Sequence, residues 1–188
     1  MLEYQRYGRN KDTVINAAYI NSSEYRRKFD GITNNKDINR ILYLKAKEML
    51  FHRSGTLFED MYWIDGNTGD IVACALNEET EKKIEYSKSV SKAVHGKTSL
   101  ITLHTHPNSM PPSIADFNSC FEHGYARCLV ICHNGIIYAY ASNQKISNTL
   151  YNLYIKNYID IGYNECDAQI MALDKITESY DIMYWEVK

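Results

Sequence analysis

The sequence predicts an α/β (α+β) fold in which a mixed β-sheet is flanked by helices. Apolar residues recur at helical spacing over residues 37–53, which indicates a long amphipathic helix. Short apolar runs within 58–76 and within 128–141 are joined in pairs by turn sequences, which indicates two β-hairpins. Helices and strands therefore follow one another in an order that is typical of a sheet covered by helices.

Length and composition indicate a single domain over residues 1–188. We expect its core at about 37–142, with an N-terminal extension at 1–36 and C-terminal helices within 146–180. Apolar residues make up 45% and charged residues 23%, which is ordinary for a globular protein and argues against a largely disordered chain. The net charge of -2 gives no bulk attraction to nucleic acid or to an anionic membrane, so neither is an expected partner.

The N-terminal composition and the cysteines predict a cytoplasmic location. The first ten residues lack the apolar stretch of a signal peptide, and no apolar run approaches the roughly 20 residues that span a bilayer. The five cysteines include no Cys-x-x-Cys pair, which argues against structural disulfides and against a thiolate zinc site. Cys128 and Cys132 fall on one face of a predicted strand, where we expect them to be buried.

The first half of the chain is expected to fold around the long helix. Asp37 is the candidate N-cap of this helix, and Gly55 follows its last turn as a breaker. The Gly-Asn-Thr-Gly sequence at 66–69 predicts a turn between two strands. The predicted elements are a short helix at 22–29, a loop at 31–36, the helix from 37, strands at 58–65 and 70–76, a weaker strand at 82–86, and a loop or short helix at 89–94.

The second half begins with a strand and a rigid loop. All three prolines lie within 107–112, Ser113 is a candidate N-cap, and Gly124 closes the helix that follows. The sequence His133-Asn134-Gly135 is a strong signal for a turn between two strands. The predicted elements are a strand at 99–103, the loop at 107–112, a helix at 114–123, strands at 128–132 and 136–141, and helices at 146–160 and 165–180.

His104, His106 and Asp116 form a compact set of candidate metal ligands. The two histidines are two residues apart at a strand end, so their side chains point to the same face. Asp116 lies in the first turn of the next helix, which the proline-rich loop folds back toward the strand end. Zinc in hydrolytic sites takes imidazole and carboxylate ligands and keeps an open position for water. The sequence therefore predicts a catalytic zinc site.

A hydrolytic zinc site also needs a general base that takes a proton from water. Glu59 is the candidate, because it begins the first strand of the core and its carboxylate could face the ligands. Asp60 is a rival that would point to the opposite face, and Glu48 is a second rival. The remaining histidines lack ligand spacing and are expected at surface or turn positions: His52, His95, His123 and His133.

These residues resemble the JAMM motif of the JAB/MPN metalloproteases. That motif reads Glu, then His-Ser/Thr-His-Pro, then Ser-x-x-Asp. In this chain the corresponding residues are Glu59, His104-Thr105-His106-Pro107, Ser113 and Asp116. The order of elements is also similar over about residues 37–142, because a helix precedes the Glu and a strand delivers the histidines. The resemblance implies the JAB/MPN fold, which is cytidine-deaminase-like.

The resemblance also implies a role for each matching residue. His104, His106 and Asp116 would bind zinc, and Glu59 would take the proton of the attacking water. Ser113 would stabilise the oxyanion of the tetrahedral intermediate as a hydroxyl donor. Active members of the family cleave peptide or isopeptide bonds, often at the C-terminus of ubiquitin or ubiquitin-like proteins. The implied activity is that of a zinc metalloprotease or deubiquitinase-like isopeptidase with a protein or peptide substrate.

The loop before Ser113 departs from the family pattern. Six residues, 107–112, separate His106 from Ser113, where the family usually has seven, and we expect the shorter loop to alter the substrate groove more than the metal site. Residues 13–75 also resemble phage- and prophage-encoded JAB-like proteins, through Glu24-Tyr25-Arg26 with Phe29 and through residues 52–56 before Glu59. This second resemblance implies a bacterial or phage-associated branch, in which a phage structural protein is a further candidate substrate.

Two other interpretations stay open. A non-catalytic MPN-like scaffold or binding module would typically lack the metal ligands that this chain has. A phosphoesterase or a deaminase would keep the metal, but phosphoesterases usually need more carboxylates for two metals. Deaminases of this general fold use a Cys-x-x-Cys ligand pair, which is absent here. Ubiquitin-like conjugates, phage structural proteins and small peptides are equal candidates as substrate, and no pattern favours one oligomeric state.

Overall fold

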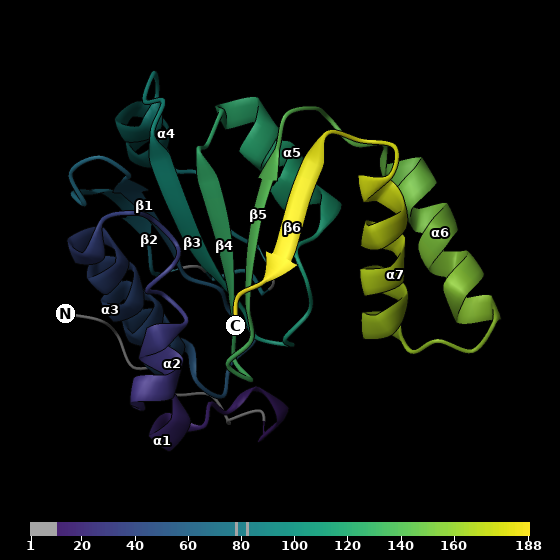
Figure 1. Ribbon diagram of the computed structural model, residues 1–188, viewed down its shortest axis with the longest axis horizontal. Coiled ribbons are helices and arrows are strands. Elements are labelled where there is room, and N and C mark those ends of the chain that lie inside the picture. Colours follow the sequence, from purple (N-terminus) through teal and green to yellow (C-terminus); the bar gives the residue numbers. More distant parts are fainter. Residues whose placement is uncertain (1–10, 78, 82) are drawn as a thin grey trace.

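A six-stranded mixed sheet forms the centre of the protein (Figure 1). The computed structural model describes residues 11–77, 79–81 and 83–188. The strand order is β2-β1-β3-β4-β5-β6, and of these neighbours only β3 and β4 are parallel. The strands are β1 (Met61–Asp65), β2 (Ile71–Ala75), β3 (Leu100–His106), β4 (Arg127–Cys132), β5 (Ile137–Ser142) and β6 (Ile182–Glu186). The two predicted hairpins are confirmed as β1–β2 and β4–β5.

Helices cover both faces of this sheet. Residues of α1, α2 and α3 contribute to a hydrophobic cluster on one face, and residues of α4, α5, α6 and α7 contribute to a cluster on the other. The helices are a 3-10 helix (Lys11–Thr13), α1 (Ala17–Ile20), α2 (Ser23–Arg27), α3 (Lys36–Arg53), α4 (Lys88–Val94), α5 (Ile114–His123), α6 (Asn148–Asp160) and α7 (Glu165–Thr177). The predicted fold class, a mixed sheet flanked by helices, is therefore confirmed.

Strand β3 lies between β1 and β4, and all seven of its residues are buried. Side chains alternate between the two faces of a strand. Ile101 and Leu103 accordingly belong to the cluster beneath α3, whereas Leu100 belongs to the cluster beneath α5. The same alternation places His104 and His106 together on the α5 face. Because β3 and β4 are parallel, a crossover must join them, and α5 is that crossover.

Helix α5 begins and ends as the sequence predicts. The hydroxyl of Ser113 accepts a hydrogen bond from the Asp116 backbone N–H, and the Asp116 carboxylate accepts one from the Ser113 N–H. This reciprocal capping box satisfies two donors that a helix start otherwise leaves unpaired. Gly124 adopts a left-handed conformation with φ 65° and ends the helix. The cap also fixes where the Asp116 carboxylate can point.

The long helix α3 starts before its predicted N-cap. The side-chain oxygen of Asn35 accepts from the backbone N–H groups of Asp37 and Ile38, so Asn35 caps the helix and the prediction of Asp37 is wrong. Asp37 lies inside the first turn, where a negative charge still interacts favourably with the helix dipole. At the other end Gly55 has φ 80° and follows the last turn, as predicted.

The segment predicted as a strand at 82–86 and the C-terminal segment that forms β6 differ from expectation. The weak strand predicted at 82–86 is wrong for residues 83–86, which form no strand, and Lys82 lies outside the described residues. The loop or short helix at 89–94 is a helix, α4. Strand β6 is not predicted, because it is a sheet edge on which Met183 and Trp185 are exposed and no buried face marks the pattern.

The sheet and its core extend on both sides of the predicted limits at 37 and 142. Strand β6 pairs with β5 in antiparallel register and completes the sheet. In the N-terminal extension, Ile20 and Tyr25 are fully buried against the α3 face, while residues 1–10 lie outside the described part of the chain. These packing partners follow from tertiary contacts, which local sequence patterns do not encode.

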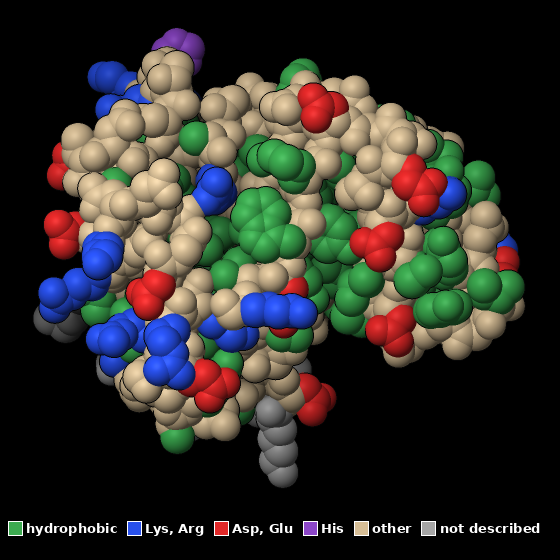
Figure 2. All heavy atoms as spheres, in the orientation of Figure 1, with side chains coloured by type: hydrophobic (Ala, Val, Ile, Leu, Met, Phe, Trp, Pro, Cys, Tyr) green, Lys and Arg blue, Asp and Glu red, His purple; other side chains and the backbone are tan. Residues whose placement is uncertain are grey.

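The two C-terminal helices form a hairpin beside β6 (Figure 1). Both were predicted, with α7 ending at Thr177 rather than 180. Figure 2 shows hydrophobic side chains exposed over this hairpin, and Leu153, Ile159 and Ile161 are exposed by 52%, 45% and 72%. Within the described residues, no helix combines the length and the apolar character needed to cross a membrane.

Candidate metal centre

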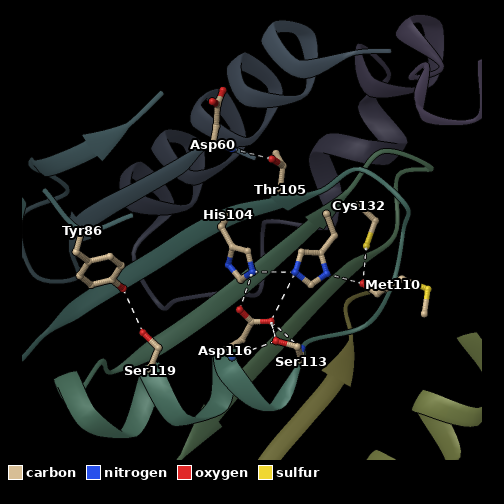
Figure 3. A network of polar contacts seen from close by, with 10 residues as sticks. Asp60, Tyr86, His104, Thr105, Met110, Ser113, Asp116, Ser119 and Cys132 are labelled. Atoms are coloured by element: carbon tan, nitrogen blue, oxygen red, sulfur yellow. Dashed lines mark hydrogen bonds and ion pairs between the residues drawn. The ribbon is translucent and has the colours of Figure 1, made fainter. Parts of the chain in front are cut away.

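Three predicted ligands meet on the α5 face of the sheet (Figure 3). His104 and His106 come from β3 and are 3% and 8% exposed, and Asp116 comes from the first turn of α5. The two imidazole Nε2 atoms are 3.1 Å apart. His104 Nε2 lies 3.3 Å from Asp116 Oδ1, and His106 Nε2 lies 3.6 Å from Asp116 Oδ2. The strand end and the capped helix start thus bring together the residues that the sequence singled out, in an arrangement that could hold a metal ion.

The outer nitrogen of His106 has a defined partner. His106 Nδ1 lies 2.8 Å from the carbonyl oxygen of Met110, to which it can only donate. A proton on Nδ1 leaves the Nε2 lone pair directed at the cluster, which is the usual way that a backbone carbonyl orients a histidine ligand. The Cys132 thiol contacts the same carbonyl oxygen at 3.6 Å. The Met110 carbonyl is a contribution of the proline-rich loop that the sequence did not predict.

Charge favours a cation at this cluster. Burial alone would raise the pKa of Asp116, but the charges and hydrogen bonds of His104 and His106 lower it well below its usual value. Burial would lower the pKa of His106, but the hydrogen bond and charge of Asp116, with the charge of Glu59, outweigh it and raise the pKa to about 9. The same negative charges that hold a proton on His106 would attract a metal ion in its place.

Glu59 lies two residues before β1 and lines the same cavity as the three ligands. Its position is fixed through the next residue, because the Asp60 N–H donates to Thr105 Oγ1 at 2.9 Å and the Asp60 carbonyl accepts from the Thr105 N–H at 3.1 Å. Glu59 is 8% exposed and its charge acts on His106. The structure therefore brings the predicted base into the cavity that contains the ligands.

Asp60 points to the opposite face, as predicted. Its carboxylate lies 2.5 Å from Arg53 Nε and 2.6 Å from His52 Nδ1, and its side chain is fully buried. These contacts occupy both oxygens of the carboxylate. Glu48, the other rival of Glu59, accepts hydrogen bonds from Lys45 and Tyr62 at the α3 side of the molecule. Neither rival lines the cavity.

The hydroxyl of Ser113 has a partner within the capping box. Ser113 Oγ donates to Asp116 Oδ2 at 2.8 Å, and the Ser113 N–H donates to the same oxygen at 2.7 Å. Oδ2 therefore has two donors, which leaves Oδ1 directed at His104 for a metal. Ser113 lines the cavity, so its hydroxyl could also reach a substrate after giving up its bond to Asp116. Its predicted role as an oxyanion donor stays a prediction.

The cavity around the cluster has a volume of about 380 Å³. Its walls combine apolar side chains with several hydroxyl groups that the sequence did not single out. Among them are Tyr86, Thr102, Ser119, Tyr125 and Tyr140. Ser119 follows Asp116 by three residues, so helical periodicity could have placed it on the same face of α5. Tyr86 comes from an irregular segment, and no sequence signal marked it.

The prediction for the other four histidines is correct in part. His95 and His123 are exposed. The surface position predicted for His52 is wrong, because its side chain is half-buried against Asp60. His133 lies in a turn but is only 2% exposed, and its Nδ1–H donates to the Thr13 carbonyl at 2.7 Å. The burial of His52 follows from its contact with Asp60, eight positions further along the chain, and His133 keeps its predicted turn position although its side chain is buried. Cys128 and Cys132 are buried, as expected.

Comparison of the chain with protein-family models, with curated proteins and with solved structures found no match. The function is therefore inferred from the chemistry of the site itself.

Proposed function

We propose that this protein is a zinc-dependent metallopeptidase of the JAMM type, which hydrolyses a peptide or isopeptide bond. The observation that carries the proposal is the convergence of His104, His106 and Asp116 in a cavity that Glu59 also lines. The resemblance to the JAMM motif assigns the same four residues to one site from the sequence alone. We place the fold in the JAB/MPN class on this basis, as part of the proposal.

The separation of the ligand atoms fits the dimensions of a zinc site. Zinc bonds of about 2.0–2.1 Å at tetrahedral angles place two ligand atoms about 3.3 Å apart. The distances of 3.1 Å between the imidazole nitrogens of His104 and His106, and of 3.3 Å from His104 to Asp116, are close to this value. Two imidazole nitrogens and one carboxylate oxygen also leave the fourth position open, as in hydrolytic zinc sites.

Each residue of the site would have its own role in the proposed reaction. When bound, zinc supplies Lewis-acid chemistry that polarises a carbonyl and lowers the pKa of water. The Glu59 carboxylate takes the proton of the attacking water and delivers it to the leaving amine. Met110 holds His106 in the tautomer that presents Nε2, and Ser113 holds Oδ2 of Asp116. Candidate substrates are ubiquitin-like conjugates, a phage structural protein or a small peptide.

The proposal is tested by metal analysis together with a cleavage assay. Purified protein should contain one zinc per chain, and the His104→Ala variant should contain none. Cleavage is assayed over ubiquitin-like conjugates, phage structural precursors and short peptides, with the His104→Ala protein as control. Absence of stoichiometric zinc in the natural chain would remove the proposal and favour the scaffold interpretation.

Replacement of the base separates catalysis from metal binding. The Glu59→Gln variant should keep its zinc but lose turnover by about 10²- to 10⁴-fold, because an amide cannot accept the proton. Glu24→Gln is the matched control, since Glu24 is an exposed residue of α2, on the opposite face of the sheet from the cavity. Full activity of the Glu59→Gln variant would exclude Glu59 from the mechanism.

A further inference from the structure

A chain of hydrogen-bonded groups lies along one wall of the cavity. The Trp63 indole N–H donates to Tyr125 Oη at 2.9 Å. Tyr125 Oη lies 3.1 Å from Tyr86 Oη, which in turn lies 3.2 Å from Ser119 Oγ. Tyr125, Tyr86 and Ser119 all line the cavity that contains the candidate metal ligands. Figure 3 shows the last contact of this chain, between Tyr86 and Ser119, beside Asp116.

Aromatic packing holds the two tyrosines of this chain in place. The His123 ring stacks on Tyr86 with centroids 5.0 Å apart, and on Tyr125 with centroids 5.3 Å apart. Trp63 meets Tyr86 edge-on at 5.1 Å. Rings that are packed from more than one side present their hydroxyl groups at fixed positions. The wall of hydroxyls is therefore a preformed surface of the cavity.

The number of protons leaves one hydroxyl donor unused. Three hydroxyl groups carry three protons, but the contacts between Tyr125, Tyr86 and Ser119 use only two of them. The indole of Trp63 can only donate, so it does not accept the third proton. Within the described residues these three hydroxyls have no other hydrogen-bond partner. One hydroxyl donor is thus available to a ligand in the cavity, whichever direction the hydrogen bonds among the three hydroxyl groups take.

Ser119 is the member of this hydrogen-bonded series that lies nearest to the candidate metal ligand Asp116. It follows Asp116 by three residues on α5, so the two side chains share one helix face. Because Trp63 donates at the far end, each hydroxyl passes its proton onward most favourably in the direction of Ser119. The free proton is then on Ser119 Oγ, one helical turn from the proposed metal ligand.

We propose that Ser119 is a substrate-binding residue that donates a hydrogen bond to a backbone carbonyl of the substrate next to the scissile bond, with Tyr86 and Tyr125 as positioning residues behind it. The proposal rests on the proposed metallopeptidase function. A neutral, single donor matches a peptide carbonyl, which every residue of a protein substrate offers regardless of its side chain. Ser119 would thus select for an extended peptide chain and orient it beside the candidate metal ligands.

Hydroxamates test this proposal without knowledge of the natural substrate. Acetohydroxamate binds a zinc site through its own two oxygens only, whereas acetyl-Gly-Gly-hydroxamate and a succinyl hydroxamate extended by Gly-Gly add peptide carbonyls on either side. Their affinities are measured for zinc-loaded natural protein and for Ser119→Ala, Ser119→Thr and Ser91→Ala. Ser91 is an exposed serine of α4 and serves as the matched control. Zinc content and thermal unfolding of each variant are measured in parallel.

The expected result is a loss that depends on the peptide extension. Ser119→Ala should weaken at least one extended hydroxamate by about 3- to 10-fold, with acetohydroxamate unchanged. Ser119→Thr should restore the affinity, and Tyr86→Phe should give a smaller loss. Equal binding of all probes by the natural protein and Ser119→Ala would overturn the role of Ser119 while leaving the metal site intact. Absence of zinc or of any hydroxamate binding would overturn both proposals, and the two failures are thereby distinguished.

Discussion

Two clusters of histidine and carboxylate side chains lie on opposite faces of the same sheet. On the α3 face, the Asp60 carboxylate contacts His52 and Arg53. On the α5 face, the Asp116 carboxylate contacts His104 and His106. Both clusters combine an aspartate with histidine and lie next to β3, yet of the two only the second lies among the residues that line the 380 Å³ cavity.

The difference lies in the source of the positive charge. Arg53 supplies a permanent cation to Asp60, and its Nη2 also donates to the Leu76 carbonyl at 2.7 Å, so this cluster is complete. On the α5 face, no lysine or arginine among the described residues forms an ion pair with Asp116. A carboxylate and two imidazoles without such a partner can accept a metal ion, as we propose for this cluster. The lack of a lysine or arginine paired with Asp116 among the described residues therefore fits the proposed metal site.

Removal of the fixed cation should give the largest effect on stability. Arg53→Met leaves the buried Asp60 carboxylate without its strongest partner, and breaking one side of a buried ion pair costs about 3–5 kcal/mol. Urea unfolding measures the change. Arg40→Met is the matched control, because Arg40 is an exposed arginine of the same helix and should matter by less than about 0.5 kcal/mol. Equal stability of the two variants would contradict the assignment of Arg53 as the internal cation.

Added zinc should supply to Asp116 on the α5 face the positive charge that Arg53 supplies to Asp60 on the α3 face. At a zinc concentration of about 100 times Kd, the free energy of unfolding should rise by about 2.7 kcal/mol, because the ligands converge only in the folded state. Asp116→Asn should abolish this increase. Asp37→Asn, which alters an exposed aspartate in the first turn of α3, should retain it. A chelator should reverse the increase, and a natural protein that zinc does not stabilise would remove the contrast between the faces.

Loss of the serine cap should have a smaller effect on both stability and metal affinity. Ser113→Ala removes the N-cap of α5, which should cost about 1 kcal/mol in urea unfolding. It also removes a hydroxyl that holds Asp116 Oδ2, which should weaken zinc by about 10-fold in a competition titration. Ser113→Thr should restore both quantities. Unchanged zinc affinity in Ser113→Ala would show that the backbone alone orients Asp116.

The same variant tests the predicted oxyanion role. Turnover of Ser113→Ala measured at saturating zinc excludes the effect on metal affinity. A residual loss of about 10²- to 10³-fold would support a donor to the oxyanion. Turnover equal to that of the natural protein would restrict Ser113 to its capping contacts.

Local rules predicted the parts of the site that local contacts build. The cap of α5 joins Ser113 to Asp116 three residues away, and alternation along β3 puts His104 and His106 on one face. The sequence placed Glu59 and Asp60 on opposite faces by the same alternation. Each of these features depends on residues that are neighbours in the chain.

The features that were not predicted depend on contacts between distant segments. Tyr86 lies in an irregular segment and reaches Ser119 across 33 positions. His133 is buried because it meets Thr13, 120 positions away. Strand β6 forms because β5 offers it an unpaired edge, although its own side chains are largely exposed. The pattern of apolar residues within one segment does not indicate which distant segment will pack against it.

A carboxylate at the edge of the α3 face gives the smallest predicted effect. Glu48 accepts hydrogen bonds from Lys45 and from the Tyr62 hydroxyl, at 2.7 Å and 2.8 Å. Burial would raise the pKa of Glu48, but the hydrogen bonds of Lys45 and Tyr62 lower it below its usual 4.5. Because the folded-state pKa is lowered, Glu48 stabilises the fold above about pH 4.5 and loses this contribution as the pH falls through its folded-state pKa.

Glu48→Gln should therefore reduce stability at pH 7 by less than about 1 kcal/mol, since this carboxylate is partly exposed and screened by solvent. The difference between the variant and the natural protein should shrink in urea unfolding as the pH is lowered below 4.5. A loss at pH 7 as large as that of Arg53→Met would mean that pairing with a cation, rather than burial, sets the energy of these clusters. The burial of Asp60 would then not explain why its pair with Arg53 matters more than the partly exposed pair of Glu48.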